Sequence, residues 1–171
     1  MTPAAAVRAC LSNYATFSGR ARRSEYWWFF AFVLLGTFVL SFVDAALFGG
    51  GTAEVDASPR QPLTGLFQLA MLIPMLAAGW RRMHDSNRPG IYILLPILFS
   101  FAFVFFALIG MTGIAAMGGG EGLFRMLGGG FLFAAVASQI VLTVLMVFWL
   151  TRPSDPGPND YGPPPPAAET A

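Results

Sequence analysis

Long apolar runs separated by short polar segments dominate the pattern along the chain. Four of these runs, at residues 27–48, 63–80, 91–117 and 131–150, each carry at most one charged side chain. A helix rises about 1.5 Å per residue, so about 20 apolar residues cross the ~30 Å hydrocarbon core of a bilayer. The pattern predicts four transmembrane helices.

The segment before the first run predicts a short helix of a different kind. Thr2-Pro3 is typical of a helix start, and the apolar residues Val7, Leu11, Tyr14 and Phe17 follow at spacings of four, three and three. This helix is too short to cross a membrane. The sequence leaves open whether it is an interfacial helix on the membrane surface or packs against the protein's own spans.

The end of the chain is rich in proline, with prolines at 153, 156, 158 and 163–166. Proline removes a backbone donor and breaks helices, so we expect residues 151–171 to form a flexible Pro-rich tail. Residues 1–150 are then expected to form a single integral membrane domain. The predicted fold class is all-α, a polytopic membrane helical bundle.

The composition supports this fold class and limits the partners. Hydrophobic residues make up 56% of the chain and charged residues 11%, whereas soluble domains average about 25% charged residues. The lipid bilayer is therefore the first expected partner. The net charge of +1 argues against nucleic acid, because a phosphate-binding domain needs a clear basic excess.

The arginines predict the orientation of the spans, because cytoplasmic segments of membrane proteins carry an excess of basic residues. With the N-terminus inside, the outer loops hold only Arg60 and Arg125. We therefore expect a multi-pass protein of the bacterial inner (plasma) membrane with both termini cytoplasmic. The inner segments hold the other eight basic residues, Arg8, Arg20, Arg22, Arg23, Arg81, Arg82, Arg88 and Arg152.

Two polar segments on the predicted inner face combine arginines with acids. Arginine can pair bidentately with a carboxylate, so a structural clamp between the segments is one interpretation. The alternative is a concave interfacial site for anionic phospholipid headgroups, because clustered arginines each attract anionic lipid by about 1 kcal/mol. The candidate residues are Arg20, Arg23, Glu25, Arg81, Arg82, His84 and Asp85.

The remaining chemistry is sparse. His84 is the only histidine and Cys10 the only cysteine, so we expect no metal site, no cofactor and no assigned catalytic residue. Asp44 is a carboxyl inside the first span. Gln68 enters the second span from the same side, and an Asp44–Gln68 hydrogen bond is the expected intramembrane polar contact.

Three blocks of residues resemble a known family. These are Phe17-x-Gly19-Arg20-x-x-Arg23-x-Glu25-Tyr26-Trp27, then Arg81-Arg82-x-His84-Asp85 with Gly90, and finally Gly157-x-Asn159-x-Tyr161-Gly162. Together they resemble the bacterial inner-membrane family called domain of unknown function 805. The resemblance implies a membrane protein and implies no activity.

The sequence favours a non-catalytic scaffold or binding module, whose partner is an anionic lipid, a second copy of the chain or another membrane protein. Two alternatives remain. A small transporter or channel component needs a polar path through the bilayer, and Ser100 and Gln139 are the strongest polar candidates there. An enzyme acting on a lipid headgroup needs His84 as a base.

Overall fold

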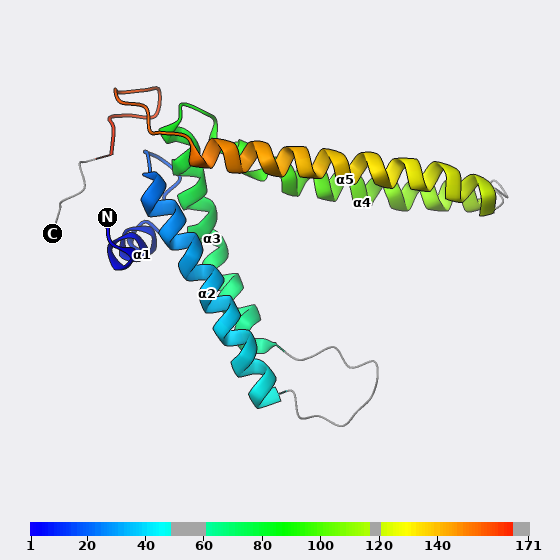
Figure 1. Ribbon diagram of the computed structural model, residues 1–171, viewed down its shortest axis with the longest axis horizontal. Helices are drawn as coiled ribbons and strands as arrows, with labels where there is room; N and C mark the ends of the chain where they lie inside the picture. Colours follow the sequence, from blue (N-terminus) through cyan, green and yellow to red (C-terminus); the bar gives the residue numbers. More distant parts are fainter. Residues whose placement is uncertain (49–60, 117–120, 166–171) are drawn as a thin grey trace. The chain divides into compact units, whose positions relative to one another are not determined.

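The computed structural model describes residues 1–48, 61–116 and 121–165, and its regular elements are helices (Figure 1). Four of these helices, α2 to α5, are long and apolar enough to cross a membrane. The predicted all-α polytopic membrane fold is therefore confirmed. Residues 49–60, 117–120 and 166–171 lie outside the described residues, and with them most of the first predicted outer loop and the end of the predicted tail. The elements are α1 (Pro3–Ser12), α2 (Arg23–Phe48), α3 (Pro62–Asp85), the 3-10 helix η1 (Gly90–Leu94), α4 (Leu95–Ala116) and α5 (Glu121–Thr151).

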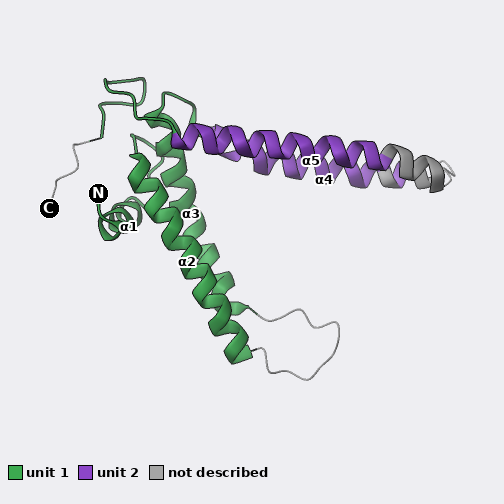
Figure 2. Cartoon of the chain, in the orientation of Figure 1, with its two compact units in different colours: residues 1–90, 152–171 green, residues 91–151 purple. Residues whose placement is uncertain are grey.

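The contacts divide the chain into two compact units (Figure 2). Unit 1 comprises residues 1–90 and 152–171, and so it contains α1, α2, α3 and the tail. Unit 2 comprises residues 91–151 and contains α4 and α5. A single domain over 1–150, followed by a flexible tail, stays a prediction.

The centre of unit 1 is the antiparallel pair of α2 and α3 (Figure 1). Gly36 lets the two helices approach closely, because a Cβ atom added there would lie 2.6 Å from the ring of Phe67. The Phe67 ring also meets Phe32 edge-on, with ring centroids 6.2 Å apart. A side chain at position 36 would therefore force the Phe67 ring to move.

We expect Gly36→Leu to destabilise the α2–α3 pair by about 1–3 kcal/mol, because overpacking a helix contact forces side chains and backbone to shift. The measurement is the midpoint of unfolding of the purified protein in mixed micelles with increasing dodecyl sulfate. Gly65→Leu on α3 is the matched control, because a Cβ atom at Gly65 meets nothing within 4 Å. Equal midpoints for the two variants would contradict the close contact.

Helix α1 begins as the sequence predicts and packs on α2 and α3. The Thr2 hydroxyl accepts a hydrogen bond from the Ala5 N–H at 3.3 Å, and Pro3 occupies the first turn, where its missing donor is not needed. Ala6 and Cys10 are fully buried. Their small side chains allow α1 to lie close against the neighbouring helices.

The predicted apolar face of the N-terminal segment divides into two parts. Leu11 is 39% exposed, on a side of α1 that differs from the buried side of Ala6 and Cys10. Tyr14 and Phe17 follow the end of α1, where the Tyr14 hydroxyl donates to the Ala70 carbonyl and Phe17 meets Trp80 edge-on. The side of α1 that packs on α2 and α3 consists of the small residues Ala6 and Cys10, which a pattern of large apolar side chains does not indicate.

Unit 2 is a hairpin of α4 and α5. Ser100 donates to the side-chain oxygen of Gln139 at 3.3 Å, and the rings of Phe103 and Phe131 stack with centroids 5.0 Å apart. Helix α5 begins at Glu121, before the fourth predicted run, which starts at residue 131. Backbone groups in a bilayer need internal hydrogen bonds, which favours a continuous helix even through glycines.

Candidate functional site

The segment between α1 and α2 turns at Gly19 and joins the end of α3. Gly19 has φ +83°, a left-handed conformation that glycine adopts without a steric penalty. Two residues later, the Ala21 N–H donates to the Arg81 carbonyl at 3.0 Å. This turn and backbone bond hold the Arg20 side chain beside the last turn of α3.

Asp85 at the end of α3 binds two arginines. Its Oδ1 accepts from Arg20 Nε at 3.0 Å, and its Oδ2 accepts from Arg82 Nη1 at 2.7 Å. The side chains of Arg82 and Asp85 are fully buried, and that of Arg20 is 1% exposed. Buried charges are tolerated only where they are paired and their other donors find acceptors. One carboxylate neutralises one of the two arginines, so further acceptors are needed.

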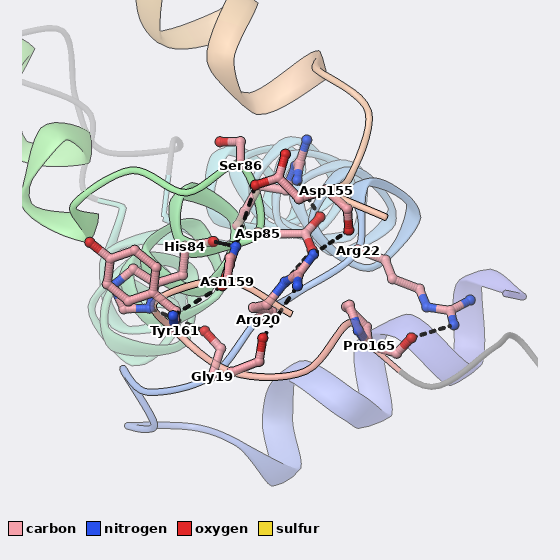
Figure 3. A network of polar contacts seen from close by, with 12 residues as sticks. Gly19, Arg20, Arg22, His84, Asp85, Ser86, Asp155, Asn159, Tyr161 and Pro165 are labelled. Carbon is pink, nitrogen blue, oxygen red and sulfur yellow. Dashed lines mark hydrogen bonds and ion pairs between the residues drawn. The ribbon is translucent and has the colours of Figure 1, made fainter. Parts of the chain in front are cut away.

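The backbone of the tail supplies those acceptors (Figure 3). Arg20 Nη1 donates to the Gly157 carbonyl at 2.7 Å, and Arg20 Nη2 donates to the Asp155 carbonyl at 2.6 Å. Arg82 Nη2 donates to the carbonyl of Arg152. In return, the Asp155 N–H donates to the Asp85 carbonyl at 3.1 Å. The tail therefore closes over the arginines.

His84, next to Asp85 at the end of α3, also contacts both the N-terminal arm and the tail. Its Nδ1 lies 3.1 Å from the Gly19 carbonyl, which only accepts, so Nδ1 carries the proton of this hydrogen bond. The imidazole stacks on the Tyr161 ring, with centroids 3.8 Å apart and planes within 6° (Figure 3). Asn159 Nδ2 donates to the His84 carbonyl at 2.9 Å. These contacts give His84 a packing role at the tail.

A second buried ion pair lies between α2 and α3. Arg81 Nη1 binds Glu25 Oε1 at 3.0 Å, and the thiol of Cys10 on α1 donates to the same carboxylate oxygen at 3.8 Å. Burial, reinforced by the Glu25 charge, raises the pKa of the Cys10 thiol to about 12. The thiol therefore stays protonated and unreactive at neutral pH. Three helices meet at this ion pair.

Six of the seven predicted site residues thus form two neighbouring groups. Arg20, Arg82, His84 and Asp85 contact the tail, whereas Glu25 pairs with Arg81. Successive residues on a helix point about 100° apart, so Arg81 and Arg82 face different partners. Arg23 is the first residue of α2 and is exposed.

Asp44 binds the start of α3 instead of Gln68. Its two carboxylate oxygens accept from the N–H groups of Leu63 at 3.1 Å and Thr64 at 2.8 Å, and Asp44 is fully buried. The first turn of a helix has N–H groups without intrahelical partners, and a carboxylate there also interacts favourably with the helix dipole. Gln68 lies one turn further along α3 and is exposed.

Sequence reasoning did not place the tail at this site. Its acceptors are backbone carbonyls, which leave no side-chain signal. The only available hint is the block Gly157-x-Asn159-x-Tyr161-Gly162. Asn159 and Gly162 exchange backbone hydrogen bonds in a tight turn, with Gly162 at φ +120°.

Within the described ranges 1–48, 61–116 and 121–165, no three His, Cys, Asp or Glu side chains gather in a way that would hold a metal ion.

Comparison with known proteins agrees with this membrane architecture. The family described as "Protein of unknown function (DUF805)" matches residues 14–163. Inner membrane protein YhaH of Escherichia coli K12 is 36% identical over 85 residues, which cover 50% of this chain and 66% of YhaH. Inner membrane protein YhaI of the same strain is 38% identical over 86 residues, which cover 50% of this chain and 64% of YhaI. The chain therefore spans just under two thirds of each relative, and no solved structure gives a significant match.

Proposed function

The chain belongs to the DUF805 family, and from its closed arginine network we propose that it is a non-catalytic scaffold. It is a multi-pass inner membrane protein, as its four apolar helices and its relatives indicate. In this proposal, Arg20, Arg82 and Asp85 form an internal clamp. The clamp fastens the N-terminal arm and the tail onto the end of α3, and makes a fixed platform for a partner.

The observation that carries the proposal is that each guanidinium nitrogen of Arg20 already has an acceptor within the protein. Its Nε binds Asp85, its Nη1 binds the Gly157 carbonyl, and its Nη2 binds the Asp155 carbonyl. With 1% of its side chain exposed, Arg20 presents no open donor to a ligand. An anionic headgroup would have to displace the tail first, so these contacts favour a clamp over a headgroup site.

The surroundings of His84 also support a non-catalytic role. A catalytic histidine needs a group that orients one ring nitrogen and leaves the other facing a substrate. Here Nδ1 donates to the Gly19 carbonyl, which orients the ring, but Tyr161 stacks on the imidazole and only 7% of the residue is exposed, so little of it can face a substrate. The contacts of His84 are those of a residue that packs the tail against α3.

The proposal places the platform on the cytoplasmic side of the membrane. The start of α2, the end of α3 and the tail meet at one end of unit 1 (Figure 1). Arg20, Arg23, Arg81 and Arg82 gather at this end, which is the distribution that the positive-inside rule associates with the cytoplasm. The partner in this proposal is another membrane protein or a second copy of the chain.

Arg20→Gln tests the clamp. The substitution removes charge-assisted hydrogen bonds worth about 1.5–3 kcal/mol each, so we expect the tail to detach more often. Chymotrypsin cleavage after Tyr161, followed by intact mass, should become at least about tenfold faster, because cleavage follows the population of the open form. Phosphatidylglycerol retained by the purified protein should not change.

Arg22→Gln is the matched comparison, because Arg22 lies in the same arm, has the same charge and donates one part-buried hydrogen bond to the tail, to the Pro165 carbonyl at 3.2 Å. Its cleavage rate should rise clearly less than that of Arg20→Gln, because it loses one bond to the tail and no buried ion pair. An Arg20→Gln protein with a protected tail and reduced phosphatidylglycerol would overturn the clamp in favour of a headgroup site.

A further inference from the structure

A groove between α1 and α2 lies apart from the arginine network. It has a volume of about 740 Å³, within the range of small-molecule sites. Val7, Arg8 and Leu11 line it from α1, and Trp28, Phe32 and Leu35 line it from α2. Trp28 and Leu35 are seven residues apart, so the groove follows α2 for about 10 Å into the apolar span.

The walls of this groove are exposed apolar side chains. Trp28 is 45% exposed and Leu35 is 63% exposed, and both belong to α2, a membrane-spanning helix, so these side chains face lipid. Tryptophan is typical of the membrane interface, and the leucine continues into the apolar stretch. The groove therefore begins at the level of lipid headgroups and extends toward the acyl chains.

Arg8 is the one charged side chain among the residues that line the groove. It is exposed, and in the described parts of the chain no acid pairs with it. By contrast, Arg20 and Arg82 form ion pairs with Asp85 and donate hydrogen bonds to carbonyls of the tail. The Arg8 guanidinium on α1, which lines the apolar groove, is therefore available to a phosphate.

We propose that this groove is a binding site for one anionic glycerophospholipid. An acyl chain lies along Val7, Leu11 and Phe32, and the phosphate group binds Arg8. Guanidinium binds phosphate oxygens bidentately, and apolar walls bind an acyl chain without cost in unpaired polar groups. This site goes beyond the scaffold proposal and does not depend on the clamp.

The occupant follows from two observations taken together. One cation in a lining that is otherwise almost wholly apolar complements an amphipathic anion. The continuity of the groove with the lipid-facing surface of α2 gives such a molecule direct entry from the bilayer. A second copy of the chain or a soluble peptide would not need both features.

The test uses the full chain, reconstituted in nanodiscs with equal amounts of phosphatidylglycerol and phosphatidylcholine and then extracted into mild detergent. Retained lipid is counted by mass spectrometry. We expect about one phosphatidylglycerol per chain, in preference to phosphatidylcholine. Arg8→Gln should lower this preference about fivefold, the factor that corresponds to about 1 kcal/mol per basic residue.

Two further variants separate charge from shape. Val7→Trp fills the groove and should remove the retained phosphatidylglycerol while Arg8 remains. The double variant Ala5→Arg with Arg8→Gln keeps the net charge of α1 but moves the guanidinium out of the groove, because Ala5 does not line it. It should behave like Arg8→Gln.

Cys10 reports whether α1 stays docked in each variant. Its thiol is fully buried with a pKa of about 12, so slow maleimide labelling indicates a folded helix contact. With labelling slow, equal retention of the two lipids or unchanged retention in Val7→Trp would overturn the proposal. Displacement of the lipid by free glycerol phosphate would overturn it too, because it would indicate a soluble ligand. If the tail of the Arg20→Gln protein detaches while the phosphatidylglycerol is still retained, the lipid site is independent of the clamp, as we propose.

Discussion

Replacing Asp85 with alanine is expected to cost about 3–5 kcal/mol of stability, because removing one partner leaves buried arginines without a counter-charge. Asp85 binds both Arg20 and Arg82, and all three side chains are buried. The loss should appear as a lower unfolding midpoint in mixed micelles and as faster chymotrypsin cleavage after Tyr161.

A second substitution makes this prediction sharper. Adding Arg20→Met to Asp85→Ala removes one of the uncompensated charges, so the double variant should recover part of the stability lost. Asp160→Ala is the control, because Asp160 is exposed on the same tail. A cost below about 1 kcal/mol for Asp85→Ala, or strict additivity with Arg20→Met, would contradict a buried charge network.

The sequence predicts the spans well, because the bilayer imposes a strict length and composition on them. It is less informative at their ends. The second run was predicted to stop at residue 80, but α3 continues to Asp85. Arg81 and Arg82 can stay helical because each finds a buried acid, and that depends on contacts with distant segments.

At the candidate site, the sequence likewise indicates which types of residue are present but not which of them pair. The sequence indicates that arginines and acids of two segments could meet. It does not indicate that Arg82 turns to Asp85 while Arg81 turns to Glu25, because that depends on how α2 and α3 pack. The contribution of the tail is harder still to foresee, since carbonyl acceptors look alike at every residue.

For Asp44, the sequence correctly indicates a carboxyl in the span that needs a hydrogen-bond donor, but the donors differ from the one predicted. A carboxyl in a span needs a donor, and the sequence offers Gln68 at a suitable depth. The structure uses backbone donors of Leu63 and Thr64 instead. The start of a helix always offers such donors, and so a helix end near a buried acid is a better first candidate than a side-chain amide.

Removing the tail is the second change with a large expected effect. A chain that ends at Thr151 loses the carbonyls of Arg152, Asp155 and Gly157, which accept from buried guanidinium groups. We expect a loss of at least about 3 kcal/mol, because each such bond is worth about 1.5–3 kcal/mol and the bonds are not additive. A chain that ends at Ala167 keeps every described contact and is the control.

The tail acts through its backbone, so its shape should matter more than its side chains. Gly162 has φ +120°, and Gly162→Ala should cost about 1–3 kcal/mol and accelerate cleavage of the tail. Gly157 also supplies a carbonyl to Arg20, but it has no positive φ and open space at its Cβ position. Gly157→Ala should therefore leave the tail protected. If both alanine variants released the tail equally, the contact would depend on flexibility at either glycine. If only Gly162→Ala releases it, the turn between Asn159 and Gly162 sets the path that brings the carbonyls to the arginines.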